Sequence, residues 1–145
     1  MERNLNSLLD VLRESAGLRL VTSRLHIKVR AASHQGFDVS VWRCGGIYSV
    51  GFAGWRCHTQ HQDAAVDLIC MAYSPACRLR VDSRGGIDYC WQVECEVDMQ
   101  WSPGHVSRRI FYPYWGAHGV RFLSNEPIPG LPAWVPMKRR HSEAA

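Results

Sequence analysis

The sequence predicts an α+β fold in which an antiparallel β-sheet of about six or seven strands carries two α-helices on one face. Two segments have the apolar spacing of amphipathic helices, and most others alternate apolar and polar residues as half-buried strands do. The strands also follow one another through short connections, which favour antiparallel pairing over crossovers. The expected order of elements is α-β-β-β-α-β-β-β-β.

The length and composition are those of one globular domain. The chain has 145 residues, of which 46% are hydrophobic and 21% are charged, enough to bury a core of its own. No apolar run approaches the roughly 18 residues that a membrane helix requires. We expect a single domain over residues 1–125 and a proline-rich, extended tail over residues 126–145 with a disordered end.

The first helix is predicted by a run of leucines near the N-terminus. One apolar stripe is formed at positions i, i+3, i+4 and i+7 by Leu5, Leu8, Leu9 and Leu12. Asn4 is placed to cap the start of this helix, and Gly17 is placed to end it in the left-handed region.

A strand over residues 25–30 and a hairpin around Gly45-Gly46 are predicted next. Residues 25–30 alternate between apolar and polar side chains. A two-residue turn would place Val41 opposite Val50 and apolar groups opposite each other along the hairpin. The other hairpin face carries mostly small residues together with Trp42, so pairing of two copies through this face is one expected route to a homodimer.

The second helix is predicted from about residue 60 to residue 73. Thr59 and Gln62 have the spacing of a capping box. Ser74-Pro75 ends the helical pattern because the residue before a proline is disfavoured in helical geometry.

A second glycine hairpin is predicted around Gly85-Gly86. The preceding apolar row consists of Cys77, Leu79 and Val81, and the following one consists of Ile87, Tyr89, Trp91, Val93, Cys95 and Val97. The two rows share a face only if the connection has an odd number of residues, for which Arg84-Gly85-Gly86 with a glycine bulge is the natural choice.

Two further strands are expected before the tail. Residues 110–115 alternate in a way that suggests a strand, and Pro113 would place that strand at an edge. Residues 119–124 form the last predicted strand.

The stretch from Gly54 to His61 gathers one thiol and two imidazoles where a strand pattern gives way to a helix pattern. Cys57, His58 and His61 are therefore candidate zinc ligands. Cys57 is also a candidate nucleophile, because a helix N-terminus lowers a thiol pKa, with His61 or a distant histidine such as His26 or His118 as its base. The spacing matches no standard zinc motif, and the same residues are also compatible with a packed thiol beside two solvent-facing histidines.

The charged residues do not indicate an obvious ligand. The net charge is +4, and fifteen of the seventeen basic residues are arginine, which is typical of a GC-rich bacterial genome. They cluster only at residues 138–140, and this distribution disfavours nucleic acid as a partner. Glu94 and Glu96 share one strand face, where Arg78 and Arg80 are placed to neutralise them.

The six tryptophans are the remaining unusual feature. Tryptophan and arginine dominate binding hot spots between proteins, and the candidate binding residues are Trp42, Trp55, Arg56, His58 and Trp115. Without a secretory signal or a cysteine framework, the chain is expected to be cytoplasmic. We expect a small bacterial, non-catalytic protein of the inhibitor, immunity or accessory type, without a cofactor, that binds another protein. The alternative is a Cys/His-centred enzyme or zinc protein.

Overall fold

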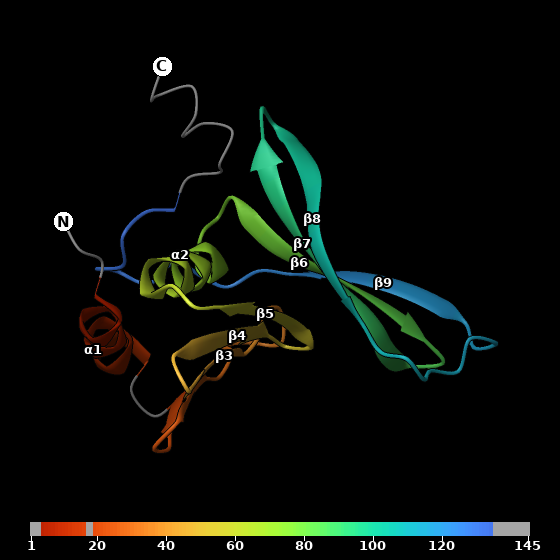
Figure 1. The fold of residues 1–145 in the computed structure, drawn as a ribbon. Coiled ribbons are helices and arrows are strands. Elements are labelled where there is room, and N and C mark those ends of the chain that lie inside the picture. The colour runs from red at the N-terminus through yellow and green to blue at the C-terminus, as the bar shows by residue number, and fades with distance from the viewer. Residues whose placement is uncertain (1–3, 17–18, 135–145) are drawn as a thin grey trace.

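The computed structural model describes residues 4–16 and 19–134, which form two helices and nine strands in two antiparallel sheets (Figure 1). In chain order the elements are α1 (Leu5–Ala16), β1 (Leu20–Thr22), β2 (His26–Val29), β3 (Val39–Cys44), β4 (Ile47–Phe52), β5 (Trp55–Thr59), α2 (Gln62–Ala72), β6 (Cys77–Arg84), β7 (Ile87–Val97), β8 (Gln100–Arg108) and β9 (His118–Leu123). The predicted α+β class with antiparallel pairing is confirmed. The strands are more numerous than expected and divide between two sheets.

The first sheet is a five-stranded meander in the order β1-β2-β3-β4-β5, and both helices lie near it. α2 packs on β4 and β5 and against α1. The predicted cap of α1 is confirmed, because the Asn4 Oδ1 atom accepts a hydrogen bond from the Asn6 N–H at 2.8 Å. The Gln62 Oε1 atom accepts a bond from the Leu5 N–H at 2.9 Å and ties the two helix starts together. Gly17, the expected helix terminator, lies outside the described residues.

The second sheet has the order β8-β7-β6-β9 and extends away from the helices (Figure 1). The core runs from the helix stripe through the first sheet to the near face of the second, and its fully buried members include Phe52, Ile69, Leu79 and Val81. Residues 124–134 contain no helix or strand and include a turn at residues 129–130. Ile128 is buried in the core, while the end that was expected to be disordered lies outside the described residues.

The first hairpin has the predicted register, since Val41 lies opposite Val50. The second hairpin corrects the prediction of a three-residue loop. Gly85 and Gly86 alone form the turn, with φ angles of 56° and 79° that match the 58° and 79° of the first glycine pair. The ladder shifts instead at a bulge between Asp82 and Ser83, and this shift brings the two apolar rows onto one face.

The stretch after Gly54 is a strand, β5, rather than a loop leading into a helix. β5 pairs with β4 through Thr59, so α2 begins only at Gln62. The predicted capping box between Thr59 and Gln62 is therefore wrong. His61 is the N-cap residue and makes no side-chain cap bond, while the Thr59 Oγ1 atom accepts a hydrogen bond from the His61 N–H at 3.1 Å.

The predicted strand over residues 110–115 is also wrong, and the strand in this part of the chain lies earlier, as β8. β8 is mostly exposed and contains Pro103, beside which its register with β7 shifts. Such a strand lacks the apolar alternation on which sequence analysis depends. The last strand, β9, confirms the prediction for residues 119–124 to within one residue at each end.

Candidate functional site

The loop between β8 and β9, residues 109–117, presents a cluster of large apolar side chains to solvent; we call it the aromatic loop. Its four most exposed members are between 72% and 87% exposed: Ile110, Phe111, Tyr114 and Trp115. Together with Ile87, Tyr112 and Pro113 they line an open groove of about 740 Å³. Single exposed apolar residues are ordinary, but a contiguous group of this kind is typical of an interaction surface.

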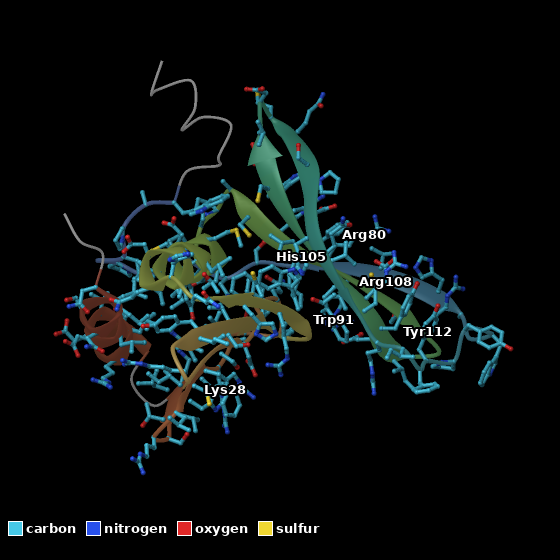
Figure 2. All side chains as sticks on the ribbon, viewed as in Figure 1. Lys28, Arg80, Trp91, His105, Arg108 and Tyr112 are labelled. Carbon is cyan, nitrogen blue, oxygen red and sulfur yellow. The ribbon has the colours of Figure 1, made fainter. Side chains whose placement is uncertain are left out.

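The aromatic loop is anchored at its base to the second glycine turn and to β7. The ring of Tyr112 stacks on that of Tyr89, with centroids 4.2 Å apart and planes 13° from parallel, and Figure 2 shows Tyr112 at this end of the sheet. The Gly85 N–H donates to the Ala117 carbonyl oxygen at 3.1 Å. A Cβ atom on Gly116 would lie 2.5 Å from the Gly85 nitrogen, so only glycine fits here. These contacts hold the loop while its apolar side chains remain exposed.

Arginines surround the start of the aromatic loop. Arg108 and Arg109 are exposed and have no ion-pair partner within the described part of the chain. Asp88, which lies nearby, already pairs with Arg121, whose guanidinium donates to its two carboxylate oxygens at 2.5 and 2.6 Å. That bidentate hydrogen bond lowers the pKa of Asp88. The groove therefore has an apolar centre and an arginine-bearing rim.

The outer face of the second sheet carries ion pairs of its own. Arg78 binds Glu94 at 2.7 Å, as predicted, and its guanidinium lies 4.1 Å from the Trp101 ring centroid and 4.0 Å from that of Phe122. Arg80 pairs with Asp82 at 2.9 Å rather than with either glutamate. A carboxylate pair free to bind metal is not present at Glu94, because that side chain is already committed to Arg78.

The candidate ligands Cys57, His58 and His61 are close in sequence but differ in their surroundings. Cys57 is half-buried and lies opposite Val50, whereas His58 is exposed and is one residue further along the strand. Adjacent residues of a strand point to opposite faces, and His61 lies beyond the strand at the start of α2. The described residues contain no group of three His, Cys, Asp or Glu side chains that could hold a metal ion.

Trp55 is buried rather than surface-exposed, and it belongs to a contact between the two sheets. Its Nε1–H donates to the His105 carbonyl oxygen at 2.9 Å. The neighbouring Arg56 N–H, at the edge of the first sheet, donates to the Ser107 Oγ atom at 3.0 Å. We call this contact, made by Gly54, Trp55, Trp91, His105 and Ser107, the inter-sheet joint; Figure 2 shows Trp91 and His105 where the sheets meet.

Trp42 is partly exposed on the first sheet and is already stacked on a neighbour. Its ring lies 3.7 Å from the His26 ring, with the planes 8° from parallel. Burial of His26, together with the positive charges of Lys28 and Arg56, lowers the pKa of that imidazole. The stack covers one face of the Trp42 ring, so this tryptophan offers a partner less surface than Trp115 does.

Cys95 and Cys77 form a pair of neighbouring thiols between the two strands of the second hairpin. Cys95 lies directly opposite Cys77 across β6 and β7. A hydrogen bond between the two thiols lowers the pKa of Cys95 and, with burial, raises that of Cys77. The sequence signal that could have revealed this pair was its place on the two apolar rows that share a face.

Comparisons of the chain with protein-family models, with curated proteins and with solved structures gave no match. None of the helices in the described ranges is long and apolar enough to cross a membrane.

Proposed function

We propose that this chain is a small, cytoplasmic bacterial protein without catalytic activity that binds another protein through the aromatic loop. The observation that carries the proposal is the exposure of Ile110, Phe111, Tyr114 and Trp115 on one anchored segment. Three of these four are aromatic residues, which bury a large area on binding and lose little side-chain entropy. An inhibitor, immunity or accessory role suits such a surface.

Burial of the exposed side chains of the aromatic loop can supply enough free energy for specific binding. Burying a large apolar side chain contributes about 1.5–3 kcal/mol, so four of them supply on the order of 6–12 kcal/mol before the costs of association are subtracted. Arg108 and Arg109 at the rim add charges that steer encounter with an acidic partner. The expected partner surface is therefore an apolar pocket bordered by carboxylates.

The cytoplasmic assignment is supported by the cysteines. All six lie among the described residues and none forms a disulfide bond, a state typical of a reducing compartment. The alternative, a Cys/His-centred enzyme or zinc protein, would need Cys57, His58 and His61 to act together. Metal analysis of untagged protein tests that alternative separately.

Site-specific crosslinking tests the proposal in the organism that makes the protein. A photoreactive phenylalanine analogue is placed at Phe111 and, as a control, at Met99, which is 91% exposed on the turn between β7 and β8. We expect one protein to crosslink at position 111 and not at position 99. Equal labelling at both positions would contradict the proposal, and a crosslink only to a second copy of the chain would replace it with self-association.

A further inference from the structure

The second hairpin carries a pair of thiols, Cys77 on β6 and Cys95 on β7, that lie directly opposite each other. They form the register pair furthest from the Gly85-Gly86 turn, to which the aromatic loop is anchored. Residues two apart on a strand share a face, so the Cys77 side chain lies on the same face of the sheet as the core residue Leu79.

The hydrogen-bond pattern of the ladder shows how closely these two residues approach. The Glu96 N–H donates to the Ala76 carbonyl oxygen at 2.8 Å, so residues 76 and 96, one step along the same register, are a hydrogen-bonded pair. Hydrogen-bonded and non-hydrogen-bonded pairs alternate along an antiparallel ladder. Cys77 and Cys95 are therefore a non-hydrogen-bonded pair, in which the Cα atoms are about 4.5 Å apart and the side chains are closest. A disulfide bond spans Cα separations of roughly 4.4–6.8 Å, so the backbone already has the spacing that this bond requires.

The two thiols differ in their access to solvent. Cys77 is 3% exposed, whereas Cys95 is half-buried at the border of the core. The hydrogen bond between the thiols lowers the pKa of Cys95 and raises that of Cys77. Because the thiolate is the form that reacts with oxidants, Cys95 is the sulfur that a small oxidant attacks first.

The placement of two thiols opposite each other is particular to this pair. All six cysteines lie in the described part of the chain, and Cys70 lies on α2. The three others lie on strands and face residues of other types in their hairpins: Cys44 faces Ile47, Cys57 faces Val50 and Cys90 faces Asp82.

We propose that Cys77 and Cys95 are a reversible oxidation site, at which hydrogen peroxide converts the two thiols into a disulfide bond across the second hairpin. The Cys95 sulfur attacks a peroxide oxygen, the O–O bond breaks, and Cys95 becomes a sulfenic acid while one water is released. The Cys77 sulfur then attacks the Cys95 sulfur and the S–O bond breaks. The hydroxyl group leaves with the Cys77 proton as a second water.

The electrons balance in both directions. The two sulfurs together lose two electrons, and one hydrogen peroxide gains them as it becomes two waters. A dithiol reductant reverses the reaction by thiol–disulfide exchange and is itself oxidised to a disulfide.

Oxidation of the full chain with hydrogen peroxide, followed by thiol counting and peptide mass spectrometry, tests the proposal. Every sample carries Cys44→Ser, because the exposed Cys44 thiol would otherwise join two copies of the chain. We expect the loss of both thiols of the pair, linked peptides that join Cys77 to Cys95, and recovery of both thiols with dithiothreitol. Thiols that resist peroxide, oxidation of Cys95 alone to a sulfinic acid, or a linkage between two other cysteines would overturn the proposal.

Two variants separate the pair from general thiol oxidation. Cys77→Ser should leave Cys95 as a sulfenic acid, which dimedone labels, and should form no disulfide within the chain. Cys90→Ser is the matched control, because Cys90 is also buried but faces Asp82, and it should form the disulfide as the parent does.

A disulfide within the chain that persists in Cys77→Ser, or equal loss of the disulfide in both variants, would contradict the proposal. If Cys77→Ser fails to fold, Cys95→Ser at the half-buried position takes its place. That variant should form no disulfide and should leave the Cys77 thiol unoxidised. None of these outcomes depends on the aromatic loop.

Discussion

The inter-sheet joint and the aromatic loop both contain tryptophan, but the tryptophan is buried in the joint and exposed in the loop. Trp55 in the joint is 2% exposed, whereas Trp115 in the loop is 77% exposed. The Trp55 indole donates to a carbonyl oxygen from a strand fifty residues away, while the Trp115 ring lies edge-on to that of its neighbour Tyr114, with the ring centroids 5.1 Å apart. Whether an aromatic residue is structural or available for binding thus depends on distant strands that cover it, which composition alone does not reveal.

Truncation of one tryptophan in each region is the strongest test of this contrast. Trp55→Ala should lower the free energy of unfolding by about 3–5 kcal/mol, because it leaves a cavity beside Phe52, with which the indole stacks at 4.7 Å. Trp115→Ala should change it by less than about 0.5 kcal/mol. Urea denaturation of both variants measures the difference. Equal losses would show that the loop is part of the folded core.

A methyl group at Gly54 probes how closely the two sheets approach. A Cβ atom there would lie 2.3 Å from the Trp91 ring, so Gly54→Ala should cost about 1–3 kcal/mol through overpacking. Gly51→Ala is the matched control, because its Cβ would meet its nearest neighbour at an ordinary 3.5 Å. Equal stability of the two variants would show that the contact between Gly54 and the Trp91 ring is not tightly packed.

Ser107→Ala removes the hydroxyl that caps the edge of the first sheet. The Arg56 N–H loses its partner at 3.0 Å, and the expected destabilisation is about 1 kcal/mol. Ser102→Ala, on an exposed position of the same strand, should be neutral. Hydrogen exchange of the Arg56 amide should accelerate only in the first variant, and protection that survives Ser107→Ala would show that another group covers this edge.

The smallest expected effect on folding stability comes from the ion pair between Asp88 and Arg121, near the aromatic loop. Because Arg121 lowers the pKa of Asp88 in the folded state, the pair stabilises the fold above the unfolded value of about 3.9, and this contribution is lost as the pH falls through the lower, folded value. Arg121 is half exposed, so Asp88→Asn should cost no more than about 1 kcal/mol at pH 7.

The pH dependence supplies the check on that variant. The stability difference between wild type and Asp88→Asn should shrink towards zero in strong acid. Asp10→Asn, which breaks a more exposed pair with Arg13, should show little difference at any pH. A gap that persists in acid would mean that Asp88 stabilises the fold by means other than its charge.

Local patterns predicted much of the fold but not how distant parts meet. The leucine stripe of α1, the pairing of Val41 with Val50 and the shared face of the second hairpin all follow from periodicity. The bulge beside Asp82 and the exposed strand β8 carry no periodic signal, so they were missed. The alternation of residues 110–115 resembles that of a strand, although Ile110, Phe111, Tyr114 and Trp115 remain exposed.

The candidate site was predicted only in part, for the same reason. Trp115 was named as a binding residue, but Phe111 was assigned to a strand, and Trp55 was expected on the surface because its partners in β7 and β8 are distant in sequence.

The measurement that bears most directly on the central claim is the affinity of the crosslinked partner for three purified forms of the chain. Wild type, Trp115→Ser and Trp42→Ser are titrated against that partner by calorimetry, Trp42 being the partly exposed tryptophan on the first sheet. We predict that Trp115→Ser weakens binding at least about tenfold, as loss of a hot-spot residue does, and that Trp42→Ser leaves it unchanged. Unchanged binding by Trp115→Ser together with a loss on Trp42→Ser would contradict the account and place the interface on the first sheet.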